Sequence, residues 1–65
     1  MVYKKLLEIL EKYDKDDIIV RFTIDGDDES YSVFLKSSDE KIVDIKKTHF
    51  NKLINLGYDQ EFNIG

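Results

Sequence analysis

The chain has 65 residues, no cysteine, and 10 basic against 14 acidic side chains, which gives a net charge of −4. A chain of this length is expected to fold as one domain, residues 1–65, and to bury only roughly 60% of the surface that its unfolded form exposes. The missing cysteines exclude disulfides and thiolate metal sites, and they favour a reducing compartment such as the cytoplasm. The negative charge opposes general binding to nucleic-acid phosphates.

The amino-acid usage also suggests a source. The chain has no proline, tryptophan or alanine, and its single arginine stands against nine lysines. This bias is typical of AT-rich coding, and it suggests a low-GC bacterium or one of its phages.

An amphipathic helix is predicted at the start of the chain, over residues 2–13. Apolar residues recur there at helical spacing, while lysines and glutamates fill the opposite face. The apolar residues are Val2, Leu6, Ile9, Leu10 and Tyr13. Because Glu8 and Glu11 interrupt the apolar run, we expect neither a signal peptide nor a membrane span.

Three strands are predicted next, over residues 18–24, 31–36 and 42–45, because apolar and polar residues alternate in each. A second helix follows, with Thr48 as its N-cap and Gly57 in the left-handed position that closes it. The fold class is therefore expected to be α+β in two layers: a helix, a three-stranded antiparallel meander and a second helix (αβββα). Both helices should cover one face of the sheet.

The last segment, residues 58–65, has the alternation of a short fourth strand, with Tyr58, Phe62 and Ile64 on one side. Three arrangements are open. The segment can pack on its own domain, add a strand parallel to the third through a right-handed crossover, or pair with the sheet edge of another subunit. Packing on its own domain is favoured, because aromatic residues near a small core usually join it.

Four carboxylates surround one glycine in the stretch IDGDDES, residues 24–30. They are Asp25, Asp27, Asp28 and Glu29. A calcium-binding EF-hand loop that starts at Asp25 would need glycine where Ser30 stands and glutamate where Lys36 stands. A hairpin turn accounts for the same residues, since Gly26 supplies a positive φ. We expect a turn and no metal site, with a weak cation site as the other option.

The turn also sets the register of the hairpin. A loop of Asp25 and Gly26 would set Ile24 opposite Asp27 and bring carboxylates onto the core face. A loop of Gly26 and Asp27 instead pairs apolar residues with each other. These pairs are Phe22 with Tyr31, Val20 with Val33, and Ile18 with Leu35. We predict this second register, or a longer loop that slides it by two residues.

The chain carries no motif that points to catalysis. His49 is the only histidine, and its place in the first turn of the second helix predicts an exposed side chain. The glycines at positions 26, 57 and 65 do not form a phosphate-binding loop, and the serines lack the nucleophile-elbow pattern. We therefore expect a protein that is not an enzyme and uses no cofactor.

The order helix, three strands, helix is similar to that of double-stranded RNA-binding domains. The stretch KKTHFNK places Lys46, Lys47 and Lys52 around the start of the second helix, where that family carries its phosphate-contacting lysines. The resemblance implies contacts between these lysines and an RNA backbone. The chain departs from the family in its first hairpin loop, which would enter a minor groove but here carries four carboxylates. It also has Phe50 where the family favours small residues.

A weak nucleic-acid mimic is a further alternative. The hairpin carboxylates should lie at the same end of the sheet as four lysines, so that these charges largely offset each other. The lysines are Lys4, Lys5, Lys46 and Lys47. At the opposite end acidic residues outnumber basic ones, among them Asp14, Asp16 and Asp17.

The outer face of the sheet, away from the helices, is the predicted partner-binding surface. Three apolar side chains should lie together there with two cations around them, and such a group with a charged rim is typical of an interface. The predicted contact residues are Ile19, Arg21, Phe34, Lys36 and Ile42 on the sheet, and Tyr58 and Phe62 in the tail.

The sequence is therefore interpreted as a small, acidic, non-enzymatic protein-binding module, either an inhibitor or an adaptor. It would act through its open sheet face on another protein or on a second copy of itself, without contacting a membrane. A phage or other mobile element would suit its size and coding bias.

Overall fold

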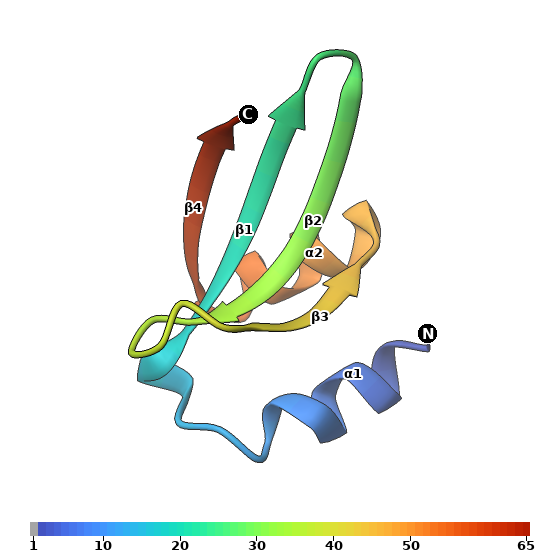
Figure 1. Cartoon of the computed structure of the whole chain (residues 1–65). Helices are drawn as coiled ribbons and strands as arrows, with labels where there is room; N and C mark the ends of the chain where they lie inside the picture. The colour runs from blue at the N-terminus through green and yellow to red at the C-terminus, as the bar shows by residue number, and fades with distance from the viewer. Residues whose placement is uncertain (1) are drawn as a thin grey trace.

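A computed structural model describes residues 2–65 and contains two α-helices, a short 3₁₀ helix and four strands (Figure 1). The helices are α1 (Tyr3–Leu10), η1 (Lys15–Asp17) and α2 (Lys47–Asn55). The strands are β1 (Ile18–Asp25), β2 (Asp28–Leu35), β3 (Lys41–Ile45) and β4 (Asp59–Ile64). The α+β class is confirmed, and the predicted order of helix, three strands and helix is present, followed by a fourth strand.

The strands form one mixed sheet in the order β3-β2-β1-β4. β1 pairs antiparallel with β2, and β2 pairs antiparallel with β3. β4 pairs parallel with β1, from Ile19 opposite Asp59 to Ile24 opposite Ile64. The tail therefore packs on its own domain, as favoured, and runs in the same direction as β3, but it lies at the opposite edge of the sheet.

The length of α2 explains why the chain reaches that edge. A nine-residue helix is about 14 Å long, and the three strand spacings between β3 and β4 also amount to about 14 Å. One helix can therefore carry the chain across the whole sheet. Phe50 and Leu53 are buried on the way.

The hairpin between β1 and β2 has the predicted register. Ile18, Val20 and Phe22 lie opposite Leu35, Val33 and Tyr31, and the ladder ends at Asp25 opposite Asp28. Gly26 and Asp27 form the loop, and Gly26 has a φ of 64°. Asp27 is not among the residues with positive φ, so the turn matches type II′, in which only the first central residue needs it.

Both helices pack on the same face of the sheet, which we call the inner face; the opposite side is the outer face. The buried residues of α1 are Leu6 and Leu10. Together with the buried residues of α2 and of the sheet they form one apolar cluster. Its members are Leu6, Leu10, Ile18, Val20, Tyr31, Val33, Phe50 and Leu53. The predicted alternation of β1 and β2 is therefore confirmed.

The helix ends differ from the sequence-based prediction at two points and agree at one. α1 ends at Leu10, before Tyr13, which is 38% exposed. Lys46, and not Thr48, is the N-cap of α2, and no side chain caps that end. Gly57 closes α2 as predicted, with a φ of 92°.

Two backbone bonds complete the end of α2. The N–H of Gly57 donates to the carbonyl of Ile54 at 3.0 Å, and the N–H of Tyr58 donates to the carbonyl of Leu53 at 3.2 Å. This pair of bonds is a Schellman motif, which satisfies the last carbonyls of a helix.

β3 contains an irregularity that moves one predicted contact residue. Val33 pairs with Val43, but Phe34 pairs with Lys41, so Ile42 is an extra residue between the two pairs. A bulge of this kind re-aims the side chain of the extra residue. Ile42 is half-buried and packs against the core cluster, and it does not join Ile19 and Phe34 on the outer face as the alternation had predicted.

Neither α1 nor α2 is long and apolar enough to cross a membrane, and no other helix of residues 2–65 is.

Candidate functional site

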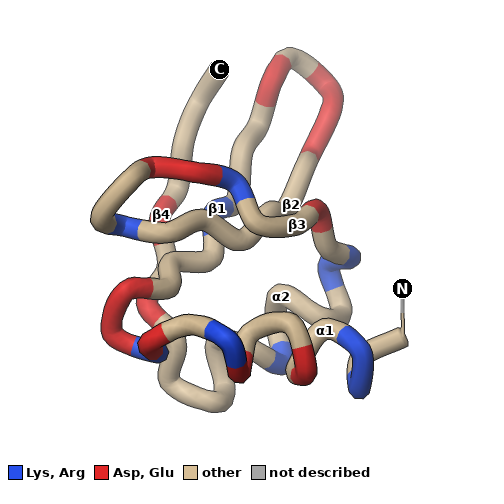
Figure 2. Tube along the Cα trace, turned by 60° about the horizontal axis from the view of Figure 1, so that its bottom comes forward, with Lys and Arg blue, Asp and Glu red and all other residues tan. Residues whose placement is uncertain are grey.

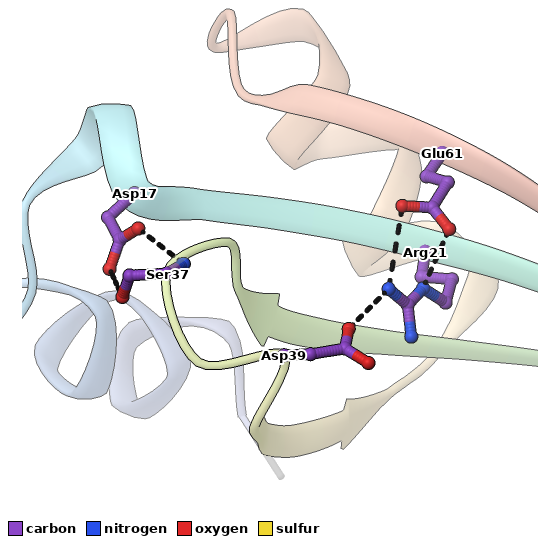
Figure 3. A network of polar contacts seen from close by, with 5 residues as sticks. All are labelled: Asp17, Arg21, Ser37, Asp39 and Glu61. Carbon is purple, nitrogen blue, oxygen red and sulfur yellow. Dashed lines mark hydrogen bonds and ion pairs between the residues drawn. The ribbon is translucent and has the colours of Figure 1, made fainter.

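Arg21 lies at the centre of the outer face and is held by residues from two other segments (Figure 3). Its Nη2 lies 2.9 Å from Oδ1 of Asp39, and its Nε lies 3.3 Å from Oε1 of Glu61. Its guanidinium carbon is 3.8 Å from the centre of the Phe34 ring, within the range of a cation–π contact. The hydrogen bond that Arg21 donates to Asp39 raises the pKa of Arg21, against the effect of burial, which lowers it.

The loop between β2 and β3 positions Asp39 for this contact. Asp39 has a φ of 54°, in the left-handed region that aspartate tolerates better than most residues. Its N–H donates to the carbonyl of Leu35 at 2.8 Å, and the N–H of Leu35 donates to the carbonyl of Glu40 at 2.9 Å. The loop therefore folds back over the outer face.

Asp17 fastens the other side of the same loop. The backbone N–H and the hydroxyl of Ser37 donate to the two carboxylate oxygens of Asp17 at 2.9 and 2.8 Å (Figure 3). The N–H of Lys36 donates to the carbonyl of Asp17 at 2.7 Å. The loop is thus tied to η1 as well as to β1.

Two further polar pairs lie on the outer face. Lys36 forms an ion pair with Asp59 of β4, and this hydrogen bond raises the pKa of Lys36. The hydroxyl of Ser32 donates to Asp44 at 2.9 Å, and this bond is the main reason why the pKa of Asp44 is lowered. Around Arg21 the outer face is therefore a polar surface with paired charges and not an open apolar one.

The apolar residues predicted for the outer face are only partly exposed. Ile19 and Phe34 are half-buried, and the guanidinium of Arg21 covers the Phe34 ring. Ile42 packs against the core on account of the bulge. The structure does not bring Ile19, Phe34 and Ile42 together as one exposed group.

The two predicted contact residues of the tail have different environments. Tyr58 is half-buried and packs against the core cluster. Nζ of Lys15 lies 5.0 Å from the centre of its ring and donates to the carbonyl of Leu56 at 2.7 Å. Phe62 is 56% exposed, and it lies on the inner face, since it pairs with Phe22 of β1. Of the two, Phe62 is the more exposed.

Phe62 belongs to an apolar surface that the sequence analysis did not identify. The hairpin and the end of β4 extend beyond both helices (Figure 1), so the inner face of the sheet is uncovered there. Ile64 is 79% exposed. We define the β4 patch as the accessible inner-face surface of five residues: Phe22, Ile24, Phe50, Phe62 and Ile64.

A shallow groove of about 430 Å³ runs along the β4 patch and is lined by Phe22, Phe50, Phe62, Gln60 and Glu61. The centre of the Phe22 ring lies 5.2 Å from that of Phe62 and 6.2 Å from that of Phe50. These distances are typical of packed aromatic pairs, so the groove has a rigid aromatic floor. The shared parity of Phe62 and Ile64 was the signal in the sequence that could have located it.

The hairpin carboxylates are not offset by lysines. The hairpin tip projects away from the lysines at the start of α2 (Figure 2). Among residues 2–65 the ion pairs involve Arg21, Lys36 and Lys41, and none includes Asp25, Asp27, Asp28 or Glu29. Glu29 accepts a bond from the hydroxyl of Tyr31 at 3.3 Å, and burial, followed by this carboxylate, raises the pKa of Tyr31.

The lysines of the RNA-binding alternative are spread along α2. Lys46 is the N-cap, Lys47 is the first helical residue, and Lys52 lies in the last turn. Nζ of Lys52 lies 4.6 Å from the centre of the Tyr3 ring. The unpaired carboxylates of the hairpin, which would face the same phosphates in that family, oppose RNA binding.

His49 is half-buried and not exposed as predicted, because its ring lies 5.4 Å from the ring of Tyr3 on α1. Burial lowers the pKa of His49, and Lys52 and Lys46 lower it further. A second, smaller cavity of about 210 Å³ is lined by Asp44, Ile45, Lys46 and His49. Within residues 2–65 no three histidine, cysteine, aspartate or glutamate side chains are grouped as metal ligands would be.

No protein-family model, no curated protein and no solved structure matches the chain. Its function has to be inferred from the surface of the molecule itself.

Proposed function

We propose that the protein is a small, non-enzymatic protein-binding module, acting as an inhibitor or an adaptor, and that its contact surface is the β4 patch together with the free backbone edge of β4. The observation that carries this proposal is the exposure of Phe62 and Ile64, 56% and 79%, beside an aromatic groove. Neighbouring apolar side chains left in water beside a groove are typical of a binding site.

The edge of the sheet adds a second means of contact. β4 is an edge strand, so the outward N–H and C=O groups of its six residues can pair with another strand. Partners that add a strand to a sheet gain affinity from the backbone bonds and specificity from pockets for alternate side chains. In this protein the groove beside Phe62 is such a pocket.

The outer face is a weaker candidate for the contact surface. Its charged residues are paired within the chain, and a partner would have to separate Arg21 from Asp39 and Glu61 before reaching Phe34. Separating these pairs would cost free energy and leave the charges without partners.

Two matched variants test the proposal. Phe62→Asp places a carboxylate in the β4 patch, and Phe34→Asp makes the same chemical change on the outer face, where Arg21 can neutralise it. Proteins retained by the immobilised wild-type chain would be identified by mass spectrometry, and the binding of each purified candidate would then be titrated by calorimetry. We expect the affinity to fall at least about 100-fold, or by about 2.7 kcal/mol, for Phe62→Asp.

Phe34→Asp should retain wild-type affinity. If the affinity falls with Phe34→Asp and is unchanged with Phe62→Asp, the contact surface is the outer face and the proposal is wrong. Circular dichroism spectra of both variants would establish that each is folded.

A further inference from the structure

We infer that the partner which binds the free edge of β4 is a second copy of this chain, paired antiparallel about a twofold axis at Phe62. The inference rests on the proposed function, because it names the occupant of the β4 patch. It would create one continuous sheet across two protomers, with both inner faces on the same side.

Every second residue of β4 has backbone groups that are free to pair. The N–H of Gly65 donates to the carbonyl of Ile24 at 2.7 Å, so residue 65 directs its backbone groups toward β1. Backbone groups alternate in direction along a strand. Gln60, Phe62 and Ile64 therefore direct their N–H and C=O groups away from β1, to the free edge.

The charged side chains of β4 do not block pairing at this edge. Edge strands are commonly protected against pairing by charged side chains. β4 has two such residues, Asp59 and Glu61, and each is already paired within its own protomer, with Lys36 and Arg21. Both lie on the outer face, so the inner face of the edge carries only Gln60, Phe62 and Ile64.

Of the possible registers between two β4 strands, the one centred on Phe62 suits both the backbone groups and the charges. With Phe62 opposite the partner's Phe62, Gln60 lies opposite the partner's Ile64, and every outward backbone group of these residues is paired. Glu61 then lies opposite the partner's Asn63, and no carboxylate faces another. A register centred on Glu61 sets two carboxylates opposite each other, which is unfavourable. A register centred on Asn63 would set Ile64 opposite the partner's Phe62 instead of the partner's Gln60, and the cross-linking experiment below distinguishes the two registers.

The same register fills the groove. Gln60 lines the groove together with Phe22, Phe50 and Phe62. Since the partner's Ile64 would lie directly beside Gln60 on the inner face, its side chain can enter the open side of the groove. The twofold axis repeats this contact, so both exposed Ile64 side chains and both Phe62 side chains leave water together.

The other edge of the sheet is less suited to pairing. β3 has five residues, and Ile42 interrupts its ladder. A bulge twists and bends a strand and so hinders pairing at an edge. β4 is longer and pairs with β1 without a register shift.

The solution mass over a dilution series tests the inference. The dilution series should run from about 1 µM to about 1 mM, so that it covers dissociation constants over this whole range. The wild-type mass should rise from 7.7 kDa toward twice that value as the concentration increases. Phe62→Asp, which sets two carboxylates opposite each other, and Ile64→Asp should stay at 7.7 kDa, and Phe34→Asp should behave as wild type.

Disulfide cross-linking tests the register, because the chain has no cysteine of its own. The variants Glu61→Cys, Phe62→Cys and Asn63→Cys would each be oxidised under the same conditions. Directly opposite residues in this register are about 5.5 Å apart between Cα atoms, within the span of a disulfide. Phe62→Cys should therefore cross-link at least about tenfold faster than the other two, whose equivalent Cα atoms are about 7–8 Å apart or more.

Several results would overturn the inference. A wild-type chain that stays at 7.7 kDa up to about 1 mM, a Phe62→Asp or Ile64→Asp variant that dimerises as wild type does, or faster cross-linking at position 61 or 63 would each do so. The proposed function is tested separately from the self-association. If the wild type is a monomer throughout but a different protein binds it in a Phe62-dependent manner, the module stands and the self-association is wrong.

Discussion

Gly26 offers a direct test of the hairpin, because two alanines of opposite chirality at this position should have opposite effects. Its φ is 64°, and a Cβ built on it meets no atom within 4 Å. A methyl group there neither gains nor loses contacts. The effect of a substitution on stability must therefore come from the backbone conformation alone.

The expected magnitudes follow from the sign of φ. L-alanine in the positive-φ conformation of a type II′ turn costs about 1–3 kcal/mol. D-alanine prefers positive φ, and by restricting the unfolded chain it should stabilise the fold by about 0.4–1 kcal/mol. For a domain of this size about 1 kcal/mol corresponds to about 4–8 °C in Tm. We expect L-alanine to lower Tm by about 4–24 °C and D-alanine to raise it by about 2–8 °C.

A chain of 65 residues is accessible to chemical synthesis, so both variants can be made. Thermal unfolding would be followed by far-UV circular dichroism at one fixed protein concentration, because self-association would make Tm depend on concentration. If L-alanine raises Tm, or if the two alanines shift it in the same direction, Gly26 does not hold a positive φ in solution. The type II′ turn would then be wrong.

Two further predictions concern α2. The pKa of His49, the only histidine, should be below its ordinary 6.5 in an NMR titration, because burial disfavours its charged form. The pKa of His49 is lower in the folded chain than in the unfolded chain, so the stability contributed by His49 is complete above pH 6.5 and is lost as pH falls through the folded pKa. The variant His49→Gln should remove this pH dependence of stability. A titration midpoint of His49 above 6.5 would contradict the reasoning. Leu53→Ala, at a fully buried position, should cost about 2–5 kcal/mol, which is comparable to the about 3–5 kcal/mol that such a core supplies. The circular dichroism spectrum of Leu53→Ala at 25 °C should be that of a largely unfolded chain. The control Leu56→Ala, at a position that is 50% exposed, should remain folded. Equal stability of the two variants would refute this account of the core.

Several features of the fold could be predicted because they depend on neighbours in the sequence. The hairpin register follows from one glycine and from the pairing of Phe22, Val20 and Ile18 with apolar residues of β2, and the structure has that register. The end of α2 at Gly57 follows equally from local chemistry, since few other residues tolerate its φ of 92°. The alternation of β1 and β2 assigned their inner faces correctly, because a strand has a period of two residues.

The candidate site depended on distances that no local pattern contains. Arg21 looked like the rim of an open apolar face, but Asp39 and Glu61, 18 and 40 positions later in the chain, close over it. Ile42 alternated as an outer-face residue until the bulge moved it toward the core. Neither the ion pairs of Arg21 nor the bulge at Ile42 has a signal within one strand.

The sequence by itself determined the two α-helices and the strands, the inner and outer faces of β1 and β2, and the turn that joins these strands, because each depends on residues a few positions apart. The tertiary structure alone decided that β4 lies beside β1, and that the helices stop short of the hairpin end. The physical reason is that both outcomes depend on how far a nine-residue helix reaches across a sheet whose strands extend past it. That mismatch in length is what leaves Phe62 and Ile64 in water.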